Sequence, residues 1–415
     1  MACLAAATHE ETTMSKSLEF TFGRWRAAGL VASALLAACG GGGGDAGSVN
    51  NNPTTAPSSY AQGAITGFGS VIVGGVRYDD SSATVSDEDG NALASSALKL
   101  GVMVQVDAGN VDRVANTAKA MGFRVGAEVL GPVAAVNVAA STVVVLGQTV
   151  TVTSSTVFDS TLAGGLAALT AGTVVEVHGI AGTTAGSITA TRIEAKTAVT
   201  AYRVRGTVAA LNTTAKTFTL GTALISYAGL AAADVPAALA NGLVVRAVVQ
   251  TVQLNGAWVA TALRGGKRAP DVTTDAHVEG TISVFTSSTS FEIAGLKVDA
   301  TNATFPDGKT GVVLGARVEV TGTVTAGVLV ATKVEVEEAR DGGQRPLELH
   351  GTMSNLNATD KTFALRGVTV WFGGTVTTTG GTLADLANGK TVEVFGVLSA
   401  DRTRLEAKRI VFNKS

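Results

Sequence analysis

Apolar and polar positions alternate in a short segment that returns five times along the chain. In each copy a glycine is followed three and five residues later by apolar residues, with one polar residue between them. The five sets are Gly101/Val104/Gln105/Val106, Gly172/Val175/Glu176/Val177, Gly242/Val245/Arg246/Ala247, Gly315/Val318/Glu319/Val320 and Gly389/Val392/Glu393/Val394. Side chains of a strand point alternately to its two faces, so this pattern predicts a half-buried strand. The polar residue is expected to face solvent and not to be a catalytic acid.

A second pattern ends four of the copies and predicts a bent strand. An apolar residue is followed by alanine two positions later and by another apolar residue five positions later. The four sets are Ile188/Ala190/Ile193, Trp258/Ala260/Leu263, Leu329/Ala331/Val334 and Leu405/Ala407/Ile410. An even step followed by an odd one changes the face of the strand, so a β-bulge or strong coil is expected midway. Such a strand can close a curved sheet.

One segment between the third and fourth strands of a copy favours a helix. In DVPAALANG, Asp234 is placed as the N-cap, Pro236 in the first turn and Gly242 as the C-terminal stop; TLADLANG in the last copy is similar. Three strands, a short helix or loop and two more strands form the order of an OB-like barrel. The fold class expected is therefore all-β, with small open β-sandwiches or rolls as the alternative.

These segments belong to a repeat of about 70 residues. The copies open at Gly63, Gly131, Gly206, Gly280 and Gly351, so successive starts are 68, 75, 74 and 71 residues apart. This period suits a small domain and is too long for one turn of a solenoid. Five tandem domains are expected, at residues 62–125, 126–200, 201–269, 270–341 and 342–415, with GGKRAPD and RDGGQRP as linkers. Because units of this size bury a modest core, they are expected to pack together or to be marginally stable alone.

The N-terminal region carries an export pattern. Basic Lys16, Arg24 and Arg26 precede an apolar run over residues 27–38 that ends in LAAC, with Cys39 as its last residue. The arrangement resembles the lipobox of bacterial lipoproteins, whose cysteine is lipid-modified and becomes the mature N-terminus. Twelve apolar residues fall short of the roughly 20 that cross a bilayer, so a signal peptide is favoured over a transmembrane anchor.

This resemblance implies a location in the cell envelope. Residues 1–38 are interpreted as the signal peptide, Cys39 as the lipid-attachment site, and residues 39–61 as a disordered Gly/Asn/Pro-rich tether. Gly40 stands where enterobacterial sorting would read an aspartate, which by analogy indicates the outer membrane, on its periplasmic face or the cell surface. Translation can begin at Met1 or at Met14.

Composition and charge restrict the partners. The chain has a net charge of -2 and 5% aromatic residues, whereas barrels that bind single-stranded nucleic acid need basic grooves and stacking aromatics. Nucleic acid is therefore not expected as a partner. Cysteine occurs only at positions 3 and 39, so the folded part has no disulfide, thiol nucleophile or cysteine metal site. No cofactor is expected.

Several motif fragments favour ordinary structure over chemistry. DGKT and NGKT lack the upstream glycine of a phosphate-binding loop, since Ala303 and Ala384 stand there. SALK and KTG lie in different copies, and no SDN accompanies them. DEDGN, at 87–91, lacks the bidentate glutamate of a calcium loop, so a polar hairpin turn is favoured. His178, His277 and His350 lie in separate copies and are expected at the surface or in structural hydrogen bonds.

One family resemblance covers essentially the whole mature chain. GFGSVIVGGVRYD, at 67–79, with the later LKLGVMVQV, resembles a domain of unknown function found in tandem in lipoproteins of Gram-negative bacteria that carry an ACGGGGG stretch. The third copy departs from the pattern, ending in ALRGGK where others have RIE or KVE. The family has no assigned catalytic residues, so the resemblance implies architecture and location only.

The function expected is that of a non-catalytic binding or scaffolding lipoprotein, held to the membrane through Cys39 and contacting an envelope protein or glycan. A passive structural stalk or coat component is the alternative. An envelope enzyme is the weakest reading, because no GxSxG, HExxH or paired-carboxylate constellation is visible. An aromatic patch shared by Trp258, Trp371, Tyr202 or Tyr227 would favour binding.

Overall fold

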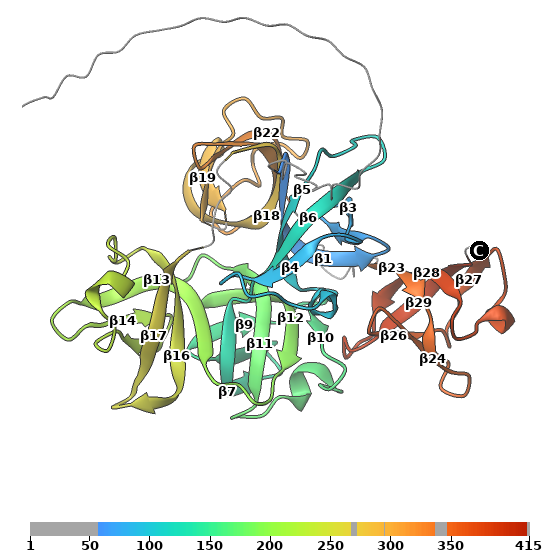
Figure 1. Ribbon diagram of the computed structural model, residues 1–415, viewed down its shortest axis with the longest axis horizontal. Coiled ribbons are helices and arrows are strands. Elements are labelled where there is room, and N and C mark those ends of the chain that lie inside the picture. Colours follow the sequence, from blue (N-terminus) through green and yellow to red (C-terminus); the bar gives the residue numbers. More distant parts are fainter. Residues whose placement is uncertain (1–56, 267–271, 294, 337–346, 413–415) are drawn as a thin grey trace, which may run out of the picture. The chain divides into compact units, whose positions relative to one another are not determined.

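The computed structural model of the protein describes residues 57–266, 272–293, 295–336 and 347–412 (Figure 1). The predicted signal peptide, Cys39, most of the predicted tether and nearly all of both predicted linkers lie outside these residues. The chain divides between Thr54 and Thr55, and the description below concerns the unit Thr55–Ser415 by itself.

The described residues form five consecutive groups of strands. The first group holds β1 (Ser59–Phe68), β2 (Val71–Val73), β3 (Val76–Asp79), β4 (Thr84–Asp87), β5 (Met103–Ala108) and β6 (Thr117–Val125). The second holds β7 (Val129–Asn137), β8 (Thr142–Val145), β9 (Gln148–Thr151), β10 (Val157–Phe158), β11 (Val174–Ala181) and β12 (Ser187–Ala195). The third holds β13 (Tyr202–Asn212), β14 (Thr217–Leu220), β15 (Ala223–Ser226), β16 (Val244–Leu254) and β17 (Ala257–Gly265).

The last two groups repeat this order. The fourth holds β18 (Val272–Ser287), β19 (Ser290–Ile293), β20 (Leu296–Asp299), β21 (Arg317–Thr325) and β22 (Val328–Val336). The fifth holds β23 (Leu347–Thr352), β24 (Ser354–Asn357), β25 (Thr362–Leu365), β26 (Val368–Trp371), β27 (Thr377–Thr379), β28 (Thr391–Leu398) and β29 (Leu405–Phe412). Its β23 and β24 together take the place of the single first strand of the other groups.

Each group closes into a barrel with five strand positions, and the short extra strands β4, β10 and β27 pair with the last strand of their group. In the second barrel β7 pairs with β8, β8 with β9 and β11 with both β12 and β7, all antiparallel, while β9 runs parallel to β12. The third barrel closes in the same order through β13, β14, β15, β17 and β16. The prediction of tandem small barrels in an all-β chain is confirmed, and the closure excludes the open-sandwich alternative.

The repeated valine pattern forms the core of the barrels. All ten predicted inward positions, from Val104 and Val106 to Val392 and Val394, are at most 2% exposed. The glycine that opens each set has a φ between +80° and +91°. Only glycine adopts this left-handed backbone without strain, so the turn before the fourth strand requires it.

The predicted bulge is present in all four closing strands. One residue of each closing strand has no opposite partner at the register shift: Thr191, Thr261, Thr332 and Lys408. In the fourth barrel the facing residue is Gly322, where a Cβ atom would lie 2.1 Å from the carbonyl oxygen of Val330. The bend therefore brings two backbones too close together for a side chain.

The predicted helix is wrong. Residues Ala232–Asp234 form one 3-10 turn, and Asp234, expected to start a helix, is the last residue of that turn. Val235 is extended because the ring of Pro236 disfavours helical backbone in the residue before it. The related segment of the fifth barrel also forms only a 3-10 turn, Leu383–Asp385, closed by a capping box between Thr382 and Asp385.

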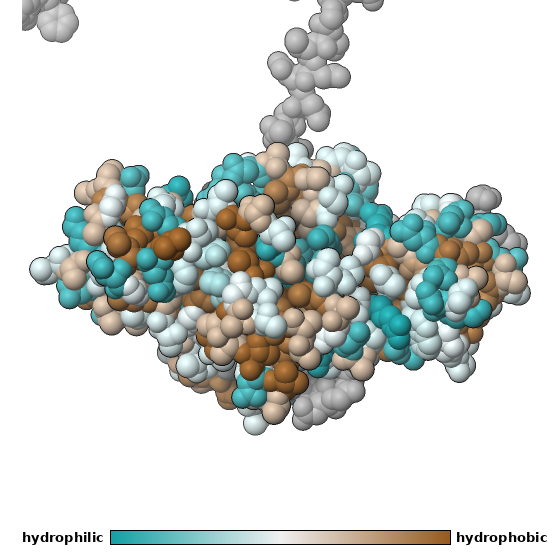
Figure 2. All heavy atoms as spheres, turned by 90° about the horizontal axis from the view of Figure 1, so that it is seen from below, coloured by the Kyte–Doolittle hydropathy of each residue, from teal (hydrophilic) through white to brown (hydrophobic). Residues whose placement is uncertain are grey.

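Neighbouring barrels are joined by backbone pairing. Strand β7 pairs with β13, and β1 runs parallel to both β18 and β23. Strand β1 begins at Ser59, inside the range predicted as tether, because Tyr60 and Ala61 are buried. On the face shown in Figure 2, apolar residues form several groups separated by polar ones. None of the helical turns in the described ranges has the length or apolar character needed to cross a membrane.

Candidate anion-binding site

A ladder of three facing residues crosses the first, fourth and fifth strands of each barrel, and all three are polar in the first, third and fourth barrels. Its middle position is the polar residue of the repeated strand pattern. In chain order the ladders read Gln62–Gln105–Arg124, Leu130–Glu176–Glu194, Arg205–Arg246–Arg264, Glu279–Glu319–Glu335 and His350–Glu393–Val411. The third barrel therefore places three arginines directly opposite one another. Like charges in this arrangement destabilise a sheet unless anions lie between or over them.

The acidic turn of the first barrel supplies such anions. Glu88 forms an ion pair with Arg205, and Asp89 accepts a hydrogen bond from Arg246. The turn is held by Asp87, whose carboxylate accepts hydrogen bonds from the backbone nitrogens of Asp89 and Asn91, both at 2.9 Å. DEDGN is thus the polar turn that the sequence favoured. Its two central carboxylates face arginines of another barrel.

A hollow of about 400 Å³ lies beside these ion pairs. It is lined by Glu88, Asp89, Gly90, Gln105, Arg124, Arg205, Arg246, Arg264, Gly265 and Gly266. Four guanidinium groups and two carboxylates line the hollow, and a third carboxylate, that of the buried Glu128, lies 3.6 Å from Nε of Arg205, so one positive charge remains in excess. Guanidinium groups bind carboxylate and phosphate oxygens through paired N–H donors, so the hollow is suited to an anion.

The four arginines differ in their exposure to solvent and in their partners. The side chains of Arg205 and Arg246 are each 5% exposed and are paired with the acidic turn. Arg264 is 54% exposed, and its Nε lies 3.9 Å from the carboxylate of Asp89. Arg124 donates from Nη1 to Gln105 at 3.0 Å. The hydrogen bond from Arg246 lowers the pKa of Asp89, which keeps this carboxylate ionised.

The prediction that the polar ladder positions face solvent is wrong for the first three barrels. Gln105 and Arg246 are buried, and Glu176 is largely covered. The reason is that neighbouring barrels and the acidic turn cover this face. The sequence pattern correctly separates two faces, but it does not reveal that the polar face is covered too.

A second charged cluster lies on the ladder of the second barrel. Glu194 contacts Arg192 at 2.5 Å, Lys196 at 2.7 Å and Lys99 of the first barrel at 3.0 Å. Burial alone would raise the pKa of Glu194, but Arg192 and Lys196 hold it well below the ordinary value. These charges pair with one another, so the cluster connects the first two barrels and offers less unpaired charge than the arginine hollow.

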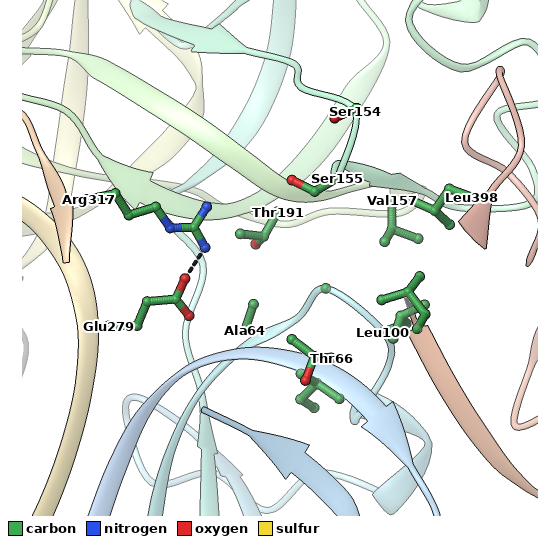
Figure 3. Close-up of a pocket in the computed structure, with 13 residues that line it drawn as sticks. Ala64, Thr66, Leu100, Ser154, Ser155, Val157, Thr191, Glu279, Arg317 and Leu398 are labelled. Atoms are coloured by element: carbon green, nitrogen blue, oxygen red, sulfur yellow. Dashed lines mark hydrogen bonds and ion pairs between the residues drawn. The ribbon is translucent and has the colours of Figure 1, made fainter. Parts of the chain in front are cut away.

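Another hollow, lined by residues of several barrels, is too small for a small-molecule ligand. Figure 3 shows the ion pair of Arg317 and Glu279 at one end and the apolar side chains of Leu100 and Leu398 at the other. Its volume is about 50 Å³, which is close to the space that one or two water molecules occupy.

The aromatic residues singled out in the sequence do not form one patch. Tyr202 and Trp258 stack edge to face in the third barrel, with ring centroids 5.6 Å apart. Tyr227 packs on Phe218 in the core of that barrel. Trp371 lies in the fifth barrel under the guanidinium group of Arg404. These four residues therefore do not form the shared aromatic surface that would have favoured binding.

The histidines take structural positions. His178 is buried, and its Nδ1 lies 2.8 Å from the carbonyl oxygen of Gly126. Burial lowers its pKa, so the ring is neutral at pH 7 and Nδ1–H donates this hydrogen bond. His277 contacts Glu319 of its own barrel. No group of three or more metal-ligating side chains occurs in the described ranges.

Sequence reasoning missed the arginine ladder, although two signals were visible. Arg246 replaces the glutamate or glutamine found at the same position of the other four copies, and ALRGGK contains Arg264 where the second and fourth copies carry a glutamate. Their partners, Glu88 and Asp89, lie more than 150 residues earlier. Only the fold brings the two segments together. The predicted lipid site, Cys39, lies outside the described residues.

Comparison with known families agrees with the repeat. A domain of unknown function, DUF5666, is found at residues 131–194, 279–335 and 350–411, within the second, fourth and fifth barrels. The chain therefore carries tandem copies of an uncharacterised domain. No curated protein sequence matches the chain.

Proposed function

We propose that the protein is a lipid-anchored, non-catalytic binding protein of the bacterial cell envelope, and that the arginine hollow is its binding site. The observation that carries this proposal is a hollow of about 400 Å³ lined by four arginines and two carboxylates, where positive charge stays in excess even with Glu128 beside Arg205. This volume falls in the range of about 300–1,000 Å³ typical of small-ligand sites. The LAAC stretch ending at Cys39 supports the anchor and the envelope location.

The anchor is tested by fatty-acid labelling of the full-length protein in its bacterial host. Wild type is expected to take up label and to fractionate with membranes, whereas Cys39→Ser is expected to remain unlabelled. Cys3→Ser is the matched control, because the chain's other cysteine lies upstream of the proposed cleavage point. Undiminished label in Cys39→Ser would remove the basis for the anchor.

Binding is tested by recovery of envelope components on the immobilised protein. Wild type is compared with Arg264→Gln, which removes one exposed guanidinium group from the hollow, and with Lys216→Asn, which removes an exposed charge of the same barrel outside it. A component retained by wild type and Lys216→Asn but reduced by Arg264→Gln supports the proposal. Equal retention by all three would refute a binding role for this hollow.

A passive structural role is the second candidate. It is favoured by the backbone pairing between barrels, through β7 with β13 and through β1 with β18 and β23. Such pairing links the units without any ligand. Recovery of no envelope component by the wild-type protein would favour this role.

A further inference from the structure

The ligand class of the arginine hollow can be specified further, in an inference that rests on the proposed function. We propose that the hollow binds a carboxylated oligosaccharide, a short sugar chain whose units carry uronic-acid carboxylates.

The acidic turn provides an internal example of what the arginines bind. Glu88 and Asp89 are consecutive residues, and their carboxylates sit on Arg205 and Arg246, which are themselves opposite each other in the sheet. Adjacent positions on the ladder thus hold closely spaced carboxylates. An external chain with a carboxylate on each unit would extend this pattern over the remaining arginines.

Arg264 and Arg124 are the arginines available to such a chain. Arg264 continues the ladder next to Arg246, is half-exposed, and reaches the nearest carboxylate only at 3.9 Å. Arg124 faces the same hollow from the first barrel. Each guanidinium group has five N–H donors, so a carboxylate entering between them would find donors on two sides.

The lining favours a hydrophilic chain. Every lining residue is charged, an amide or a glycine. At Gly90 and Gly265 a Cβ atom would meet nothing within 4 Å, so the rim leaves room for a ligand to approach the backbone. A peptide would gain little burial of apolar side chains here, whereas a sugar acid is polar over most of its surface.

The sheet also offers no free edge to a peptide strand at this position. Strand β16, which carries Arg246, is paired on one side with β13 and on the other with β17. Peptides that add a strand to a sheet need an unpaired edge. The observations therefore favour a carboxylated sugar over an acidic peptide.

Calorimetric titration of the full chain at low ionic strength tests this inference. The probes are trigalacturonate, the neutral trisaccharide maltotriose and the peptide triglutamate. Trigalacturonate is expected to bind, with triglutamate weaker and maltotriose undetected. Arg264→Gln and Arg124→Gln are each expected to weaken trigalacturonate about tenfold, since a charge-assisted hydrogen bond contributes that much. Lys216→Asn should leave its affinity unchanged.

A variant without a charge change guards against a general electrostatic effect. Gly265→Phe places a bulky side chain in the hollow and is expected to abolish trigalacturonate binding, while Trp258 fluorescence reports that the barrel remains folded. Absence of trigalacturonate binding to wild type, tighter binding of triglutamate, or undiminished binding to Gly265→Phe would overturn the inference. If wild type retains envelope components through Arg264 yet does not bind trigalacturonate, the ligand class is wrong and the binding function stands.

Discussion

Arg246 of the third barrel donates a hydrogen bond to Asp89 in the acidic turn of the first barrel. The two residues are 157 positions apart in the chain. The arginine side chain is 5% exposed and the aspartate 33% exposed, so the ion pair is buried at one end and partly solvated at the other. Together with the pair of Glu88 and Arg205, it joins two barrels that are not consecutive in sequence.

We predict that Arg246→Leu destabilises the third barrel by about 2 kcal/mol. The substitution leaves Asp89 without its closest partner, and loss of one member of a buried pair costs up to about 3–5 kcal/mol, less where solvent reaches the group. The measurement is urea unfolding followed by Trp258 fluorescence in a Trp371→Phe background. A double-mutant cycle with Asp89→Leu isolates the pair. Additive effects of the two substitutions would show that the residues are not coupled.

Acid is expected to weaken the ion pairs of Glu194 and so to lower the stability of the protein. The pKa of Glu194 in the folded protein is lowered below the ordinary glutamate value of 4.5, so its ionised form contributes stability above that value. This stability is lost as pH falls below 4.5 towards the lower folded pKa. Thermal unfolding between pH 3 and 7 should show a steeper acid loss for wild type than for Glu194→Gln. Glu335→Gln, at the same ladder position of the fourth barrel, is the control, and an acid slope unchanged in Glu194→Gln would contradict the prediction.

The bulge makes Gly322 difficult to replace. A Cβ atom there would lie 2.1 Å from a backbone oxygen, which must move for any side chain to fit. Gly322→Ala is expected to cost about 2 kcal/mol or more in the free energy of unfolding, in the upper range for point substitutions. Gly229→Ala is the matched control because a Cβ at Gly229 meets nothing within 4 Å. Equal stability of both variants by thermal unfolding would argue against the close approach.

The core of each barrel could be predicted because it depends on local periodicity. Val175 and Val177 are two residues apart on one strand, and their burial follows from that spacing whatever lies beyond the barrel. The bulge at Thr191 was predictable for the same reason, since a change from even to odd spacing requires an extra residue. The helix prediction was wrong, although the sequence contains the reason. Pro236 favours extended backbone in the residue before it, Val235.

The candidate site could not be predicted in the same way. Arg205, Arg246 and Arg264 come from three strands, and their register across the barrel is set by closure rather than by any one segment. The sequence around Glu88 and Asp89 predicts only a turn, because it does not indicate which residues of other barrels the turn will contact. Charge at a single position was visible in the sequence, but the local excess of charge arises only when the first and third barrels meet.

The five ladders also restrict the order in which the barrels can follow one another along the chain. Each barrel keeps the same interior, yet the ladder is triply basic in the third and triply acidic in the fourth. Exchanging these two units would preserve the buried positions of every barrel. It would, however, place glutamates opposite Glu88 and Asp89 in place of the arginines. The copies are thus alike as folding units but not interchangeable as neighbours, and their order along the polypeptide is itself encoded in one row of side chains.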